Sequence, residues 1–68
     1  MTRTGAELAR LREERAELER TRAELARSIE RVARVGSPAQ GEEYVAAREE
    51  KALVQTRLDE IDAILDEG

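Results

Sequence analysis

The chain has no cysteine and no histidine, and its 68 residues include one proline, four glycines and a single aromatic residue, Tyr44. Without cysteine there are no disulfides and no thiolate metal sites, and without histidine the usual general base and the commonest zinc ligand are absent. No apolar run approaches the roughly 20 residues of a membrane span, and no secretory signal is visible. These absences favour a cytoplasmic protein with no metal, cofactor or membrane partner.

The chain is rich instead in charged, helix-forming residues. Charged residues make up 41% of it, a composition typical of solvated helices and coiled coils and not of sheets or deep pockets. Residues 1–35 contain nine arginines and seven glutamates, whereas residues 36–68 contain three basic and nine acidic residues. Opposite net charges favour folding one half onto the other, and the net charge of −4 argues against independent nucleic-acid binding.

Apolar residues recur at alternating steps of three and four in both halves, which is the period of a coiled coil. The pattern comprises Leu8, Leu11, Leu18, Leu25, Ile29 and Val32, then Tyr44, Ala47, Val54, Leu58, Ile61 and Leu65, with Arg15, Arg22 and Lys51 in the same register. It predicts an all-α fold, a single antiparallel two-helix coiled-coil hairpin over residues 1–68. The predicted parts are a helix at about 6–35, a tip turn at 36–41 and a helix at about 42–67.

The connection between the helices has its own signals. Gly36 suits the left-handed residue that ends a helix, and Pro38 cannot continue that helix. Ser37 and Gln40 have the spacing of a capping box for the second helix. Glutamates follow at positions 42 and 43, where the helix dipole favours negative charge. The segment therefore predicts a tight turn.

So short a connection requires antiparallel helices. Folding about residue 39 brings acids of the second helix beside arginines of the first: Asp59, Asp62 and Asp66 beside Arg12, Arg15 and Arg20. One seam of medium-sized side chains must offset about 1.5 kcal/mol of ordering entropy per residue. A bare hairpin is thus expected to be marginal, and we expect a second copy or a larger partner to cover its apolar edge.

The second half resembles a known family. The run from Glu43 to Lys51, EYVAAREEK, is similar to the E-Y-x-A-A-R-E-E segment of bacterial Gre transcript-cleavage factors. The run from Arg57 to Leu65 resembles their R-I-x-E-I-E-x-x-L, and Gly36 matches the glycine that opens their tip loop. The resemblance implies a two-helix finger that enters the secondary channel of RNA polymerase. In that family two acids at the tip help to hold a magnesium ion for RNA hydrolysis.

This sequence departs from the family at those two acids. Ser37 stands where the family has its tip Asp, and Gln40 stands where it has its tip Glu. Because neither residue is charged, a shared Mg²⁺ would be held far more weakly. We therefore predict no catalytic residues and no enzyme activity. The 68 residues contain no counterpart of the family's globular domain, so we expect attachment through the finger or another protein.

Three functions follow as alternatives. The first, which we favour, is a non-cleaving Gre-like modulator that binds bacterial RNA polymerase through its secondary channel. Its predicted partner-binding tip comprises Ser37, Gln40, Glu42, Glu43, Tyr44 and Arg48. The second is a structural module that self-associates into a helical bundle, and the third is a cleavage factor that uses the two glutamates. Tyr44 also fits a plain cap on the seam, and Arg31 and Arg34 fit either solvated surface or contact with RNA phosphate.

Overall fold

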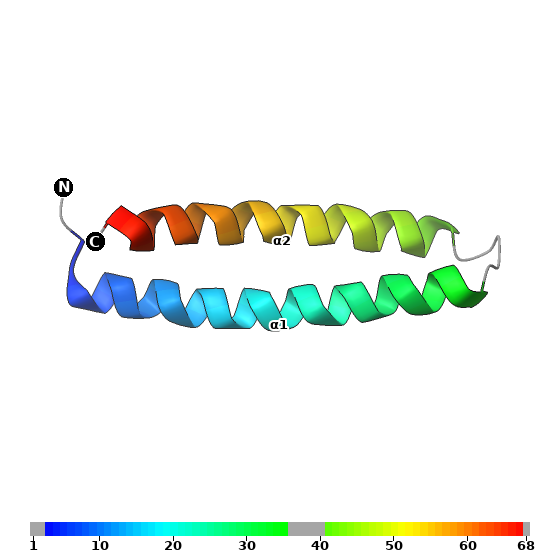
Figure 1. Ribbon diagram of the computed structural model, residues 1–68, viewed down its shortest axis with the longest axis horizontal. Helices are drawn as coiled ribbons and strands as arrows, with labels where there is room; N and C mark the ends of the chain where they lie inside the picture. Colours follow the sequence, from blue (N-terminus) through cyan, green and yellow to red (C-terminus); the bar gives the residue numbers. More distant parts are fainter. Residues whose placement is uncertain (1–2, 36–40, 68) are drawn as a thin grey trace.

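A computed structural model describes residues 3–35 and 41–67 and shows two long α-helices side by side (Figure 1). Helix α1 spans Gly5–Val35 and helix α2 spans Gly41–Glu67. They run antiparallel in a rod with extents of 50 × 16 × 13 Å. We call the end where α1 stops and α2 starts the tip end, and the opposite end the base end. The predicted all-α hairpin is confirmed, and the described residues contain no strand.

The start of α1 is capped by a motif that the sequence analysis missed. Thr4 Oγ1 accepts a hydrogen bond from the backbone N–H of Glu7 at 3.1 Å and donates one to Glu7 Oε1 at 3.2 Å. The carbonyl oxygen of Thr4 accepts the first helical hydrogen bond, from the N–H of Leu8 at 3.0 Å. Thr4 is therefore the N-cap of α1, and its hydroxyl oxygen satisfies one of the backbone donors that the helix itself leaves unpaired.

The start of α2 lies at Gly41, one residue before the start suggested by the apolar pattern, and α1 likewise starts one residue early. The acidic residues in the first turn of α2 are Glu42 and Glu43, and the partial positive charge of the helix N-terminus stabilises them there. The predicted end of α1 at Gly36 and the predicted Ser37–Gln40 capping box lie outside the described residues.

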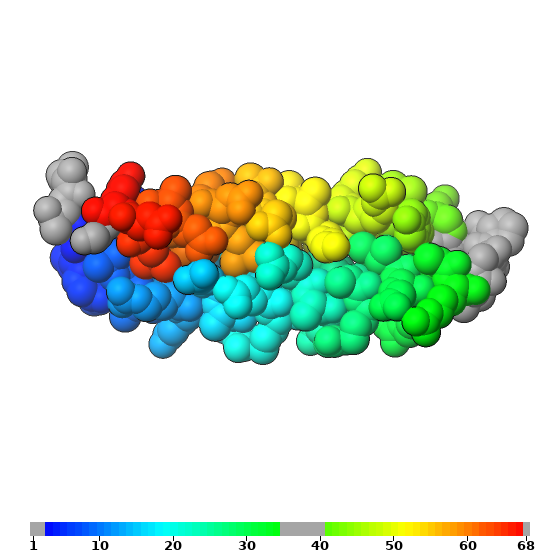
Figure 2. All heavy atoms as spheres, viewed as in Figure 1, coloured from blue at the N-terminus to red at the C-terminus, as the bar shows by residue number. Residues whose placement is uncertain are grey.

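The core is small and lies on α2. Ile61 is fully buried, Leu58 is 3% exposed and Val54 is 8% exposed. The other predicted seam residues are half-buried: Leu8, Leu11, Leu18, Leu25, Ile29, Val32, Tyr44, Ala47 and Leu65. Side chains of the two helices meet along the rod (Figure 2). Because only two helices pack together, the seam between them is open to water along both of its edges. The predicted seam is confirmed. Among the described residues, its side chains are buried only at Val54, Leu58 and Ile61, in the middle and toward the base end.

Polar seam residues of α1 reach across one edge of the hairpin. Arg22 is half-buried, and its Nη1 donates a hydrogen bond to Gln55 Oε1 at 2.8 Å. Arg15 Nε lies 3.0 Å from Asp62 Oδ1, which confirms one of the predicted arginine–aspartate contacts. The cross-helix ion pairs of the described residues do not include the other expected partners: Arg12, Arg20, Asp59 and Asp66.

The opposite edge has a stronger contact that was not predicted. Arg57 Nε and Nη2 donate to the two carboxylate oxygens of Glu14 at 2.7 and 2.9 Å, and Arg57 Nη1 donates to Glu60 at 3.2 Å. The hydrogen bond from Arg57 lowers the pKa of Glu14, and the bonds to Glu14 and Glu60 raise the pKa of Arg57. Because two parallel hydrogen bonds fix direction as well as distance, this pair aligns the base halves of the helices.

Two large apolar side chains of α2 face solvent. Val45 is 54% exposed and Leu53 is 71% exposed, and at 100° per residue they lie on either side of Glu49 on the outward face. Neither helix, over residues 3–35 and 41–67, combines the length and apolar content that a membrane crossing requires. The two exposed apolar residues lie on the face of α2 that points away from α1.

Candidate functional site

Four of the six residues predicted to bind a partner lie in the first two turns of α2. Glu42 and Glu43 are exposed there, Tyr44 is half-buried, and Arg48 is exposed. Adjacent residues on a helix point about 100° apart, so the two glutamates diverge and do not form a shared site. The remaining two, Ser37 and Gln40, lie outside the described residues.

Tyr44 and Arg48 are brought together by helical spacing. They are four residues apart, so both side chains lie on one face of α2. The Arg48 guanidinium carbon lies 5.7 Å from the centre of the Tyr44 ring, within the range of a cation–π contact. Tyr44 is half-buried, and its ring supports the Arg48 guanidinium. The pair presents a positively charged group at a defined place near the tip end.

Arg48 also lines a shallow hollow between the two helices, which the sequence analysis did not predict. Its other lining residues are Ile29 from α1 and Lys51, Ala52 and Gln55 from α2, and its volume is about 300 Å³. Ile29 and Ala52 supply apolar surface, while Arg48 and Lys51 supply two positive charges. The sequence signal that could have indicated this hollow is the spacing of three and four residues from Val45 through Arg48 and Ala52 to Gln55.

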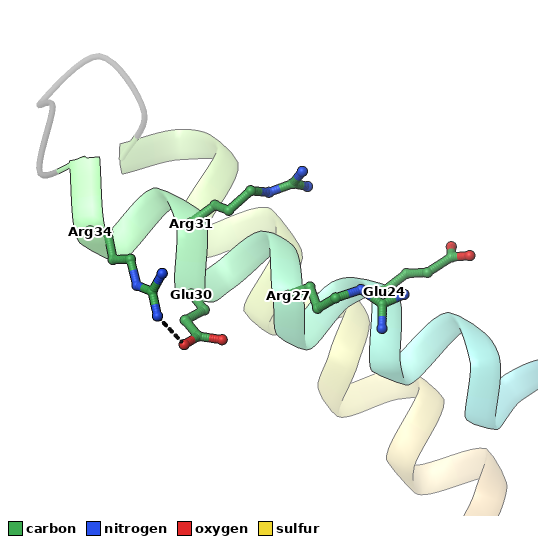
Figure 3. A pocket seen from close by; sticks show the side chains of 5 residues that line it. All are labelled: Glu24, Arg27, Glu30, Arg31 and Arg34. Carbon is green, nitrogen blue, oxygen red and sulfur yellow. Dashed lines mark hydrogen bonds and ion pairs between the residues drawn. The ribbon is translucent and has the colours of Figure 1, made fainter.

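A third feature lies on the outer face of α1 near the tip end, where Arg27, Arg31 and Arg34 surround a surface hollow of about 260 Å³ together with Glu24 and Glu30 (Figure 3). Arg34 Nη2 lies 2.8 Å from Glu30 Oε1, so part of its charge is already matched. Arg31 extends away from the helix axis in the same view. Guanidinium groups bind carboxylates and phosphates well because their donors match two oxygens at once.

Arg31 and Arg34 were predicted from the sequence as either solvated surface or a contact for RNA phosphate, whereas Arg27 was not predicted. The steps of four and three between the three residues place them on one face of the helix, and this spacing was a usable signal. All three are exposed. The tip end of the rod therefore has positive charge on α1 and acids at the start of α2.

The described residues offer no assembled metal site. In residues 3–35 and 41–67 there is no group of three or more histidine, cysteine, aspartate or glutamate residues that could hold a metal ion. Near the tip end the described residues form a cation–π pair, a hollow lined by Arg48 and Lys51, and an arginine-rich face of α1.

Residues 1–67 match the model of the GreA/GreB N-terminal family, described as transcription elongation factor, N-terminal. The chain belongs to this family. No curated protein and no solved structure gives a significant match. The protein is therefore a member of the N-terminal domain family of transcription elongation factors, a family associated with RNA polymerase.

Proposed function

We propose that this chain is a non-cleaving Gre-like modulator of transcription, which binds bacterial RNA polymerase by inserting its tip end into the secondary channel. The observation that bears most weight is the position of the EYVAAREE segment. In a member of this family it occupies the first turns of α2, at the tip end of a rod only 16 × 13 Å across. A thin rod suits insertion into a channel.

The chemistry near the tip end supports contact with a partner. Arg48 is exposed and is supported by the Tyr44 ring at 5.7 Å. A cation held in one orientation loses less conformational freedom on binding than a free side chain does. The exposed Arg31 adds a second guanidinium for a negatively charged surface. Polymerase in the cytoplasm is the expected partner.

The absence of cleavage is supported by the tip residues themselves. Ser37 and Gln40 have no charge, although the family that the sequence resembles has acids at these positions. Magnesium prefers hard anionic oxygen ligands, so the chain is expected to occupy the channel without supplying metal ligands. Occupancy alone would exclude active cleavage factors or incoming nucleotides.

Binding is tested with the fluorescently labelled chain and bacterial core RNA polymerase, using a full-length Gre factor as competitor. We expect saturable binding that the competitor displaces. Arg48→Ala should weaken it about tenfold, the equivalent of about 1.4 kcal/mol, because it removes the supported cation. Arg10→Ala is the matched control, since Arg10 is also an exposed arginine but lies in the base half. Absence of binding, or equal loss in both variants, would contradict the proposal.

Cleavage is tested separately in a backtracked complex with Mg²⁺. The wild-type chain should release no RNA fragment, whereas the double variant Ser37→Asp with Gln40→Glu should restore release by returning two acids to the tip. Fragment release by the wild-type chain that is lost in Glu42→Gln with Glu43→Gln would instead support the cleavage-factor alternative. The readout distinguishes occupancy of the channel from chemistry within it.

A second candidate function is a structural module that self-associates. The observation that favours it is the small core: only Val54, Leu58 and Ile61 are buried among the described residues. Helices that leave most of their seam half-exposed gain stability when another surface covers them.

A further inference from the structure

A second stripe runs along α2 beside the seam. Its members follow steps of three and four, the spacing that places residues in one row along a helix: Val45, Arg48, Ala52, Gln55, Asp59, Asp62 and Asp66. Gln55 accepts a hydrogen bond from Arg22, and Asp62 pairs with Arg15, so the stripe lies on one defined edge of the hairpin. We call this row, together with the adjoining Lys51 and Ile29, the Gln55 edge.

The tip half of the Gln55 edge combines exposed apolar surface with two cations. Val45 is 54% exposed, Ala52 is exposed, and the hollow of about 300 Å³ lies between Ile29 and Ala52. Within the described residues, neither Arg48 nor Lys51 forms an ion pair with a carboxylate. The tip half of the edge therefore presents two unmatched cations beside apolar surface.

The base half of the same edge has the opposite charge. Asp59 and Asp66 are exposed, and Asp62 is half-buried beside Arg15. Asp59 accepts a hydrogen bond from Gln55 Nε2 at 2.9 Å, which leaves its negative charge unneutralised. The α2 residues of this edge are thus positive toward the tip and negative toward the base, and such a row is complementary to a second copy of itself that runs in the opposite direction.

The spacing makes that complementarity specific. Arg48 lies seven residues before Gln55 and Asp62 lies seven residues after it, while Lys51 and Asp59 lie four residues to either side. If two copies of α2 cross antiparallel at Gln55, each cation faces an aspartate of the other copy. A parallel pairing in register would place Arg48 against Arg48 and aspartates against aspartates, which like-charge repulsion disfavours.

We propose that two copies of this chain pair antiparallel along their Gln55 edges, about a two-fold axis that passes near Gln55. Such a contact is isologous: each pair of residues occurs twice, once on each side of the axis. Arg48 of one copy lies against Asp62 of the other, and Lys51 lies against Asp59. Val45 then lies close to Asp66, the member of the second copy's row that the antiparallel register brings opposite it.

The pairing supplies what the hairpin lacks. It adds a second helix surface to α2, whose three buried residues are the whole core of the described chain. It also encloses Arg48, which the proposed function places against polymerase, so self-pairing and polymerase binding exclude each other. That regulatory consequence rests on the proposed function, whereas the pairing itself does not.

Sedimentation equilibrium tests the pairing without polymerase, so the result is independent of the proposed function. At low salt and up to about 1 mM chain, the wild-type mass should rise from 7.7 kDa toward twice that value. Because the pairs lie at a solvated edge, salt above about 0.5 M should weaken association. A wild-type mass that stays at the monomer value under the low-salt conditions would overturn the proposal.

Charge reversal locates the surface. Arg48→Glu with Lys51→Glu makes the four facing positions 48, 51, 59 and 62 all negative, and Asp59→Lys with Asp62→Lys makes the same four positions all positive. Each variant alone should associate at least about tenfold more weakly, because like charges then face each other, and an equimolar mixture should associate again. The matched control, Arg31→Glu with Arg34→Glu, makes the same change in charge on the outer face of α1 and should leave the mass unchanged. Equal effects of the control and the edge variants would overturn the assignment.

Orientation is tested by single cysteines, which are unique because the chain has none. A mixture of Val45→Cys and Asp66→Cys chains should form a mixed disulfide on oxidation, whereas Val45→Cys alone should not. Leu53→Cys, on a residue that is 71% exposed and off the edge, is the control for random collision. Cross-linking of Val45→Cys with itself would indicate parallel pairing and refute the antiparallel arrangement. Circular dichroism of each variant confirms that the helices persist.

Discussion

Replacement of Ile61 measures how far the hairpin depends on its small core. Ile61 is the one described side chain with no exposed surface. Truncating a buried isoleucine to alanine costs about 2–5 kcal/mol, and truncating it to valine costs about 0.5–1.5 kcal/mol. At about 0.05–0.15 kcal/mol per residue, a 68-residue chain has a free energy of unfolding of about 3–10 kcal/mol, and three buried residues place it at the low end. Ile61→Ala should therefore be largely unfolded, while Ile61→Val should fold with a lower urea midpoint.

The assay is urea unfolding followed by far-ultraviolet circular dichroism, at high salt and low chain concentration so that self-pairing does not contribute. Leu53→Ala is the control, because a side chain that is 71% exposed should change the unfolding free energy by less than about 0.5 kcal/mol. If Ile61→Ala lowers the free energy of unfolding by no more than Leu53→Ala does, Ile61 is not part of the core that stabilises the hairpin.

Two further predictions concern individual contacts. The hydrogen bond from Arg57 lowers the pKa of Glu14 below its ordinary value of 4.5, so this contact stabilises the fold above that pH and is lost as pH falls through the lowered pKa. The free energies of unfolding of wild type and Glu14→Gln, measured in urea, should therefore differ near neutral pH and converge in acid. A difference that does not change with pH would contradict the lowered pKa of Glu14. At the start of α1, Thr4→Ala should cost about 1 kcal/mol, measured by the same method. Thr56→Ala, which removes only an exposed bond to a helical carbonyl, should cost much less, and equal losses would rule out a special role for the cap.

The sequence was enough to predict the helices, their antiparallel pairing and the family. Steps of three and four from Leu8 to Val32 and from Tyr44 to Leu65 specify two amphipathic faces, and a helix with one apolar face has to bury it against another. The Arg15–Asp62 contact followed from folding the chain about residue 39. The EYVAAREE run indicated the family that the comparison confirmed. Such features depend on local spacing, and spacing can be read directly from a chain.

Other features were decided only by tertiary structure. Folding the sequence about residue 39 predicted ion pairs between arginines of α1 and aspartates of α2. The bidentate pair instead joins Arg57 of α2 to Glu14 of α1. Which of several charged neighbours pair depends on the rotation of each helix about its axis and on side-chain reach, and neither is contained in heptad spacing. The same rotation concentrates complete burial in Val54, Leu58 and Ile61 and turns Val45 and Leu53 outward. The apolar and charged edge beside Gln55 exists because α1 approaches from one side and leaves that edge uncovered.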